Sequence, residues 1–379
     1  LKISSEYNLD VDPDQLIEKL PVGIQQRVEI IKILFRDAEI LIFDEPTAVL
    51  TPQEVVEFFE IIKNLKKAGK AIIFITHKLH EVLEVCDRIN VLRSGKIVGE
   101  ELPKKTTNKK LAELMVGRKV NLKTNRQIVE KGEVLLEVNN LSILSENKEP
   151  LLSNLDVKLH KNEILGIAGV QGNGQTEFIE ALTGLRKISS GKISYFGKEC
   201  KNFSPRKIHQ LGVRHIPEDR QKQGLIGDFS LTENIILNTY YENKFSNNIA
   251  LNWSSAKKEA KRIIEKFDVR TNSEEISADK LSGGNQQKLL IGREMSRSIN
   301  LLIASQPTRG VDVGSIEYIH NQIVMARNKG IGVLLNSTEL DEIIALSDRI
   351  IVFYEGRVIA EFPSNADPNI IGLAMAGVS

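Results

Sequence analysis

Short apolar runs bounded by polar or turn residues recur along the chain. The runs "AEILIFDE" and "KAIIFITH" lie before residue 80, and "NLLIASQ" and "GIGVLLNS" lie after residue 299. Runs of this length are typical of strands that are buried on both faces of a parallel sheet. Between the first two runs, residues 52–69 form an amphipathic pattern that ends at Gly69, as a helix does. This alternation predicts an α/β fold in which crossover helices cover a parallel sheet.

Three stretches of the chain recur 261 residues further on. One offset relates all three pairs without a gap, which chance would not produce. The sequence therefore predicts a duplicated domain. The pairs are "LPVGIQQRVEI" with "LSGGNQQKLLI", "FDEPT" with "ASQPT", and "CDRINVLRSGKIV" with "SDRIIVFYEGRVI".

The repeat predicts three segments. Residues 1–100 would form the C-terminal part of a first domain, and residues 133–379 a second domain that opens on the strand "EVLLEVNNL". Residues 101–132, rich in Lys, Thr and Asn, would form a linker with a single helix at "LAELMVG". The offset carries the beginning of the second domain to a point before residue 1, so we expect the first domain to be truncated at its N-terminus.

The composition is typical of a soluble, globular protein. The 379 residues allow two or three domains, and 41% apolar and 27% charged residues are usual fractions. A net charge of +1 and 5% aromatic residues argue against a nucleic-acid partner. Cys86 and Cys200 lack the spacing of metal ligands. No apolar run approaches the roughly 20 residues that span a bilayer.

A glycine-rich stretch follows the apolar run "EILGIAG" in the second copy. "GVQGNGQT" (169–176) has the pattern G-x-x-x-x-G-K-[ST], with Gln175 in place of the lysine. Thr176 would reach magnesium, whereas Gln175 brings no charge to the phosphates. The alternative, a plain glycine-rich turn, is disfavoured by the strand before the stretch and the helical pattern after it. The glycines would let backbone N–H groups turn toward phosphate oxygens (Gly169, Gly172 and Gly174).

These motifs resemble those of the ATP-binding subunits of ABC transporters, and specifically the tandem subunits of carbohydrate and nucleoside importers. "LSGGNQQK" (281–288) is similar to the family's signature motif. "FDEPTAVLTPQE" (43–54) is similar to its magnesium-binding and catalytic strand end, and "ITHKLHEV" (75–82) to its switch-histidine segment. "PEDRQKQGLIGDFSLTENI" (217–235) and "QPTRGVDVG" (306–314) look like second-domain stretches of this subgroup. "NTYYENKFS" looks more like the nucleoside branch than the ribose or galactose branch.

The resemblance implies a P-loop NTPase (ABC ATPase) fold, in one partial and one complete copy, that binds ATP and Mg²⁺. In this family two domains pair head to tail, and each ATP lies between the phosphate loop of one domain and the signature of the other. One such site would use Asp44 to hold magnesium, Glu45 to polarise the attacking water and His77 to contact the γ-phosphate. The second copy's signature would face the same phosphate (Ser282, Gly283, Gly284, Asn285 and Gln286).

The departures from the family's motifs all fall on the other composite site. It would use the phosphate loop that lacks its lysine. Ser305 and Gln306 replace the two acids, and Thr338 stands at the histidine position. In the first signature, Pro21 has neither hydroxyl nor N–H, and Val22 crowds the backbone. No aromatic residue lies in "SILSENKEP", where the resemblance places an adenine-stacking side chain. We therefore predict one hydrolytic and one degenerate site in the intact protein.

The predicted function is that of an energy-coupling ATPase of an importer for nucleosides or simple sugars, peripheral on the cytoplasmic face of the membrane. The family implies an integral membrane permease, a periplasmic or lipoprotein substrate-binding protein, a pseudo-dimer of the chain's own two domains, and no nucleic acid. Two alternatives remain: a soluble ABC-type factor acting on ribosomes or DNA, and a truncated remnant that does not hydrolyse ATP. Glu218 and Asp219 lie where the family usually has a glutamine, and either a coupling role or a surface turn fits them.

Overall fold

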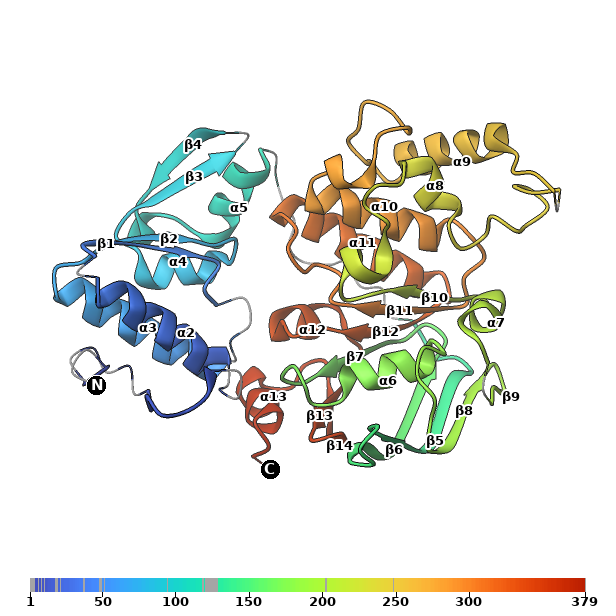
Figure 1. Ribbon diagram of the computed structural model, residues 1–379, viewed down its shortest axis with the longest axis horizontal. Helices are drawn as coiled ribbons and strands as arrows, with labels where there is room; N and C mark the ends of the chain where they lie inside the picture. Colours follow the sequence, from blue (N-terminus) through green and yellow to red (C-terminus); the bar gives the residue numbers. More distant parts are fainter. Residues whose placement is uncertain are drawn as a thin grey trace. The chain divides into compact units, whose positions relative to one another are not determined.

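The computed structural model describes the chain apart from residues 1–3, 6, 8, 10, 18–19, 21, 37, 48–49, 51, 94, 118, 120–128, 202, 248 and 379. The chain divides into two compact units, Leu1–Val120 (unit 1) and Asn121–Ser379 (unit 2), which Figure 1 shows in blue to cyan and in green to red. The predicted boundary at residue 100 therefore moves toward the C-terminus. Residues 101–117, which we expected in a linker, belong to unit 1.

A six-stranded sheet forms the centre of unit 2, in the order β10-β11-β12-β7-β13-β14. The strands pair in parallel except β14, which runs antiparallel to β13. Every residue of β7, β11 and β12 is buried, as their uninterrupted apolar runs predict. The strands are β7 (Ile164–Ala168), β10 (Val213–Ile216), β11 (Leu301–Ser305), β12 (Gly332–Asn336), β13 (Arg349–Tyr354) and β14 (Arg357–Pro363).

The two faces of this sheet enter separate hydrophobic cores. In Figure 1 the sheet lies between a group of helices and a smaller antiparallel sheet. The first face packs on α8 (Leu231–Ile236), α9 (Trp253–Lys266), α10 (Gly283–Met295), α11 (Val313–Asn328), α12 (Leu340–Leu346) and α13 (Pro368–Met375). The second packs on α6 (Gln175–Leu182), α7 (Pro205–Gln210) and the sheet that contains β5 (Val134–Leu144), β6 (Pro150–His160), β8 (Ser190–Tyr195) and β9 (Lys198–Glu199).

The described part of unit 1 contains two strand pairs and the helices α2 to α5. β1 pairs in parallel with β2, and β3 pairs antiparallel with β4. Helices α2 and α3 pack on one face of β1 and β2, where the rings of Phe43 and Phe58 meet edge to face with centroids 5.6 Å apart. Leu111 of α5 is buried in a hydrophobic core that also contains residues of β3. The bounds are α2 (Val22–Leu34), β1 (Ile40–Asp44), α3 (Pro52–Lys67), β2 (Ala71–Ile75), α4 (Leu79–Val85), β3 (Ile89–Arg93), β4 (Lys96–Glu101) and α5 (Asn108–Val116).

The elements of unit 1 recur in unit 2 at the offset found in the sequence. Helices α2 and α10, α3 and α11, and α4 and α12 each begin and end 261 residues apart. The register of β1 on β2 is that of β11 on β12 at the same offset. The bulge between Val91 and Leu92 recurs between Val352 and Phe353. Local structure therefore repeats down to single backbone irregularities.

One face of β1 and β2 is exposed, which the apolar runs do not predict. Ile42 is 61% exposed and Ile73 51%, whereas their counterparts Ile303 and Leu334 are fully buried. In unit 2 this face is covered by α6 and the antiparallel sheet, and β7 lies between β12 and β13. The described part of unit 1 has no strand between β2 and β3. Burial on both faces is therefore confirmed for β11 and β12 and wrong for β1 and β2.

Candidate functional site

The glycine-rich stretch forms the turn between β7 and α6. Strand β7 ends at Ala168, and α6 begins at Gln175 with Gly174 as its N-cap. Gly174 has a φ of 101°, and a Cβ there would lie 2.5 Å from the Leu152 side chain, so the position requires glycine. The loop lies at the carboxyl edge of the parallel sheet, where β7 separates β12 from β13. Open α/β sheets bind ligands at such a switch point.

Gln175 folds over the inside of this loop. The side chain is 5% exposed, and its Nε2 donates to the carbonyl of Val170 at 3.1 Å. Asn173 donates to the same carbonyl at 3.2 Å and accepts the N–H of Glu355 at 2.9 Å, which fastens the loop to the β13–β14 turn. The loop is thus closed by an uncharged amide. Thr176, the predicted magnesium ligand, is exposed at the start of α6.

At the end of β11, the two positions predicted to have lost their acids are both buried. Gln306 Oε1 accepts hydrogen bonds from the N–H of Thr338 at 3.3 Å and from its hydroxyl at 3.2 Å. Ser305 Oγ is buried and has no hydrogen-bond partner among the described residues. The structure brings Gln306 and Thr338 together as the repeat implies, but neither side chain can accept a proton from water at neutral pH.

The end of β1 brings the predicted catalytic residues of unit 1 together. Strand β1 ends at Asp44, which is exposed. His77 Nδ1 lies 2.7 Å from Glu45 Oε1, a distance at which the imidazole donates to the carboxylate. The two side chains are 24% and 42% exposed, so both are accessible from solvent. A carboxylate oriented by a neighbouring group at hydrogen-bond distance has the geometry of a general base.

The two strand ends share one backbone conformation. Glu45 and Gln306 both have a φ of 47°, a left-handed value that is uncommon outside glycine. Each N–H donates to the carbonyl of the neighbouring strand, Glu45 to Ile75 at 2.8 Å and Gln306 to Asn336 at 2.7 Å. The units therefore differ in side-chain chemistry on the same backbone frame.

A buried contact behind both strand ends was missed by the sequence analysis. Thr308 Oγ1 donates to Glu342 Oε1 at 2.8 Å, and Thr47 makes the same contact with Glu81. All four residues are buried. The contact joins the turn after the strand to the helix after the histidine or threonine position. Its members recur at the 261-residue offset, and that recurrence is the signal that could have revealed them.

The predicted signature forms the start of α10. Ser282 is the N-cap residue, and Asn285 Nδ2 donates to its Oγ at 3.0 Å. Gln286 Nε2 donates to the carbonyl of Ala278 at 2.9 Å, so this predicted ligand residue also anchors the helix. Ser282 is exposed, and the helix start presents N–H groups and a positive dipole end suited to an anion.

The first copy's signature is only partly described. Pro21 lies outside the described residues, and so does the side chain of Val22, the first residue of α2. In the part of the chain that the structure describes, no three or more His, Cys, Asp or Glu side chains gather as a metal site. No described helix is both long and apolar enough to cross a membrane.

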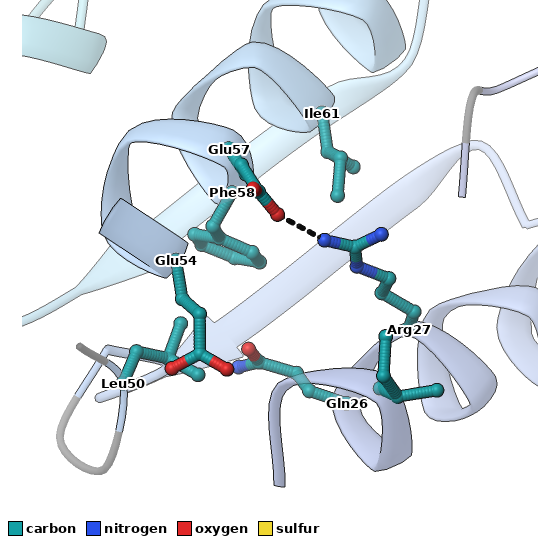
Figure 2. A pocket seen from close by; sticks show the side chains of 8 residues that line it. Gln26, Arg27, Leu50, Glu54, Glu57, Phe58 and Ile61 are labelled. Atoms are coloured by element: carbon teal, nitrogen blue, oxygen red, sulfur yellow. Dashed lines mark hydrogen bonds and ion pairs between the residues drawn. The ribbon is translucent and has the colours of Figure 1, made fainter. Parts of the chain in front are cut away.

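A hollow of about 290 Å³ lies in unit 1 between α2 and α3 (Figure 2). An ion pair joins Arg27 to Glu57 across it. Gln26 Nε2 donates to the carbonyl of Pro46 at 2.5 Å, just after the end of β1. None of the predicted catalytic or phosphate-binding residues lines the hollow, so we assign it no part in the site. Its lining consists of Ile24, Gln26, Arg27, Leu50, Glu54, Glu57, Phe58 and Ile61.

Residues 152–309 match the family of ABC transporters. The chain is 47% identical to the nucleoside import ATP-binding protein NupA of Lactococcus lactis subsp. cremoris, over 100% of the chain and 75% of that protein. It is 48% identical to the guanosine import ATP-binding protein NupO of Bacillus subtilis, over 99% of the chain and 74% of that protein. A nucleotide-free ATP-binding cassette from an ABC transporter matches 64% of the chain and 96% of its own length, with a TM-score of 0.54 at 21% identity, which shows the fold alone.

The fold, the phosphate loop at the sheet edge and these matches define a P-loop NTPase with the ABC ATPase fold, as the sequence predicts. The chain belongs to the ABC transporter family, among its ATP-binding subunits, and is a transport ATPase.

Proposed function

We propose that this subunit couples ATP hydrolysis to the import of nucleosides or simple sugars. Nucleosides are favoured, because the names of both relatives, at 47% and 48% identity, refer to nucleoside or guanosine import. The proposal includes an integral membrane permease and a substrate-binding protein as partners. In that arrangement the subunit acts at the cytoplasmic face of the membrane. The cargo is selected by those partners, so this chain's own residues perform the energy-coupling step.

The proposed hydrolytic site combines the β1 end of unit 1 with the signature of unit 2. The contact between Glu45 and His77 at 2.7 Å is the observation that carries this proposal. Glu45 would orient and polarise the attacking water, and His77 would hold that carboxylate and contact the γ-phosphate. Ser282 and the N–H groups at the start of α10 would bind the same phosphate.

Magnesium fits the donor chemistry at the β1 end. Asp44 is an exposed carboxylate at a strand end, and carboxylate oxygens are the ligands that Mg²⁺ prefers. When bound with ATP, Mg²⁺ would neutralise charge on the phosphates. Asp44 would hold the ion, directly or through water, and Thr176 would be the corresponding ligand in the other site.

The second composite site would be degenerate. The amide nitrogen of Gln175 donates to the carbonyl of Val170, and the amide oxygen of Gln306 accepts the N–H of Thr338. These internal hydrogen bonds maintain the loop and the strand end without a charge or a general base. This site would bind nucleotide weakly, through backbone N–H groups and Thr176, without hydrolysing it. No observation on the chain favours an action on ribosomes or DNA.

The test is Glu45→Gln in the complete transport complex, supplied with ATP and magnesium. We expect kcat to fall by at least about 100-fold with ATP binding retained, because the amide cannot accept the water's proton. Glu60→Gln is the matched control, since Glu60 loses the same charge on the exposed face of α3. Normal hydrolysis by Glu45→Gln, or an equal loss in the control, would show that Glu45 lacks the assigned role.

A further inference from the structure

The segment after β10 contains two acids for which the sequence left a turn or a coupling role open. Asp219 is the N-cap of a short π-helix, Arg220–Gly224, and accepts the N–H groups of Gln221 and Lys222 at 3.0 Å each. These bonds account for Asp219 as a local turn residue. The neighbouring Arg220 and Glu218 instead reach out to other elements of unit 2.

Arg220 joins three segments through its guanidinium. Its Nη1 donates to the carbonyl of Arg309 at 2.7 Å, Nη2 to that of Gly310 at 3.2 Å, and Nε to Gln286 Oε1 at 3.3 Å. Gln286 lies in the first turn of α10, and residues 309–310 lie in the turn that follows β11. The fixed fork of a guanidinium can serve such divergent acceptors together, whereas a lysine ammonium is a single compact charge.

The signature glycines make room for this arrangement. A Cβ on Gly283 would lie 2.6 Å from Arg220 Nη2 and 2.9 Å from the carbonyl oxygen of Gly310. A Cβ on Gly284 would lie 2.5 Å from Ser315 Oγ at the start of α11. Glycine at both positions therefore lets the start of α10 pack on the 306–315 segment. The glycines have this packing role in addition to any approach to phosphate.

Glu218 contacts the side chain of Arg309 in the turn after β11. Its Oε1 accepts hydrogen bonds from Arg309 Nη1 at 2.7 Å and, weakly, from Gln171 Nε2 of the phosphate loop at 3.5 Å. The Glu218 and Arg309 side chains are 21% and 50% exposed, so their ion pair adds little stability by itself. Its geometric effect is to fix Arg309, the residue whose carbonyl receives the shortest bond from Arg220.

We propose that Arg220 is a positioning residue that fixes the start of the signature helix α10 against the turn after β11. Ser282 and the first N–H groups of α10 then have one defined position, as preorganised phosphate donors require. The consequence for turnover depends on the proposed function, in which the signature contacts ATP in the hydrolytic site. The positioning itself concerns unit 2 alone and can be measured without any nucleotide.

Hydrogen–deuterium exchange of the full chain tests the positioning. The variants are Arg220→Met and Arg220→Lys, and Lys222→Met is the control, because Lys222 lies in the same π-helix with its side chain 85% exposed. We expect the hydrogen-bonded amides of residues 286–288 in α10 and of Arg309 to exchange at least about tenfold faster in both Arg220 variants. Exchange in β7 should be unchanged, and the control should match the original chain.

Wild-type protection in Arg220→Lys would show that charge alone suffices and would overturn the proposal. Unchanged protection in both variants, or faster exchange throughout unit 2, would overturn it as well. If Arg220→Met does not fold, Glu218→Gln replaces it, with faster exchange expected at the amide of Arg309 and unchanged protection counting against the proposal.

A second measurement separates positioning from general stability. In the transport complex, Arg220→Lys should lower kcat about tenfold with the KM for ATP unchanged, because the signature contributes after ATP has bound. A KM increase at constant kcat would contradict the proposed positioning. If exchange changes as expected while Glu45→Gln hydrolyses ATP normally, the positioning stands and the proposed function fails.

Discussion

Glu45 and Gln306 occupy the same left-handed backbone position and differ in what their side chains can do. At each position the N–H bonds across to the next strand, which holds the uncommon φ of 47° in place. The backbone frame therefore tolerates either residue. Glu45 lies against His77, whereas Gln306 is closed on Thr338. At the residue scale, the side-chain chemistry of a strand end can change without loss of its fold.

His215 in β10 gives a pH-dependent contribution to stability. Burial lowers its pKa from 6.5 to about 4, although Glu294 acts in the opposite direction. The folded state binds this proton less readily than the unfolded state, so stability falls as pH drops from about 7 toward 4. At pH 5 we expect the chain to have lost about 2 kcal/mol through this residue. Between pH 7.5 and pH 5, the unfolding free energy of His215→Gln, measured in urea, should fall by about 2 kcal/mol less than that of the original chain.

The same window includes His209, whose pKa burial and Arg214 lower to about 4. His209 remains in both proteins, so it cancels from the comparison. Equal losses in the original chain and in His215→Gln would mean that His215 titrates with its ordinary pKa.

At the scale of elements, β1 and β11 show how one sequence pattern meets two environments. Both are five-residue apolar runs that pair in parallel with the next strand at equivalent registers. Strand β11 is buried throughout, because α6 and the antiparallel sheet cover its second face. Strand β1 alternates between buried and exposed residues. Strand identity follows from the local pattern, whereas burial depends on distant segments.

Ile303 and Ile42 are a matched pair for testing this difference. Ile303→Ala removes a fully buried side chain and should cost about 2–5 kcal/mol of unfolding free energy. Ile42→Ala, at a position 61% exposed, should cost less than about 0.5 kcal/mol. Urea unfolding of the full chain measures both. A cost for Ile42→Ala near that for Ile303→Ala would mean that this face of β1 is covered in solution.

Helices, strands and their offset could be predicted from the chain's local patterns. The helix that ends near Gly69, the strand at 133–141 and the helix after the phosphate loop all formed where the pattern indicated. The boundary at residue 100 moved, because Leu111 and its helix pack on β3. The apolar residues of a Lys-rich stretch do not indicate which hydrophobic core they will join. That assignment required contacts between segments far apart in sequence.

At the scale of the whole molecule, each unit has its own hydrophobic cores. The buried residues of the cores of unit 2 lie within 135–375, and those of unit 1 within 9–111. We expect residues 129–379 to fold alone, because both faces of their sheet are covered within the fragment. A single cooperative thermal transition by circular dichroism is the expected result. A fragment without a transition would contradict the independence of unit 2.

Turnover is also a property of the whole molecule. The phosphate loop of unit 2 has Gln175 in place of lysine, and Glu45, the proposed general base, lies in unit 1. We predict negligible ATPase activity for these 379 residues alone, measured as phosphate release at saturating ATP and magnesium. Activity that persists after repurification and is lost in Glu45→Gln would contradict the proposed division of parts between composite sites.

The sequence by itself determined the fold class, the repeat and its offset, the phosphate loop and the pairing of positions 45 with 306 and 77 with 338. These depend on local periodicity and on residue types within short motifs, which a linear chain carries directly. Only the tertiary structure decided that Glu45 contacts His77, that Gln306 is closed on Thr338, and that Arg220 bridges the signature helix and the turn after β11. The exposure of one face of β1 was also decided there. Such features depend on side-chain direction and on which distant segment covers a surface, and a sequence pattern contains neither.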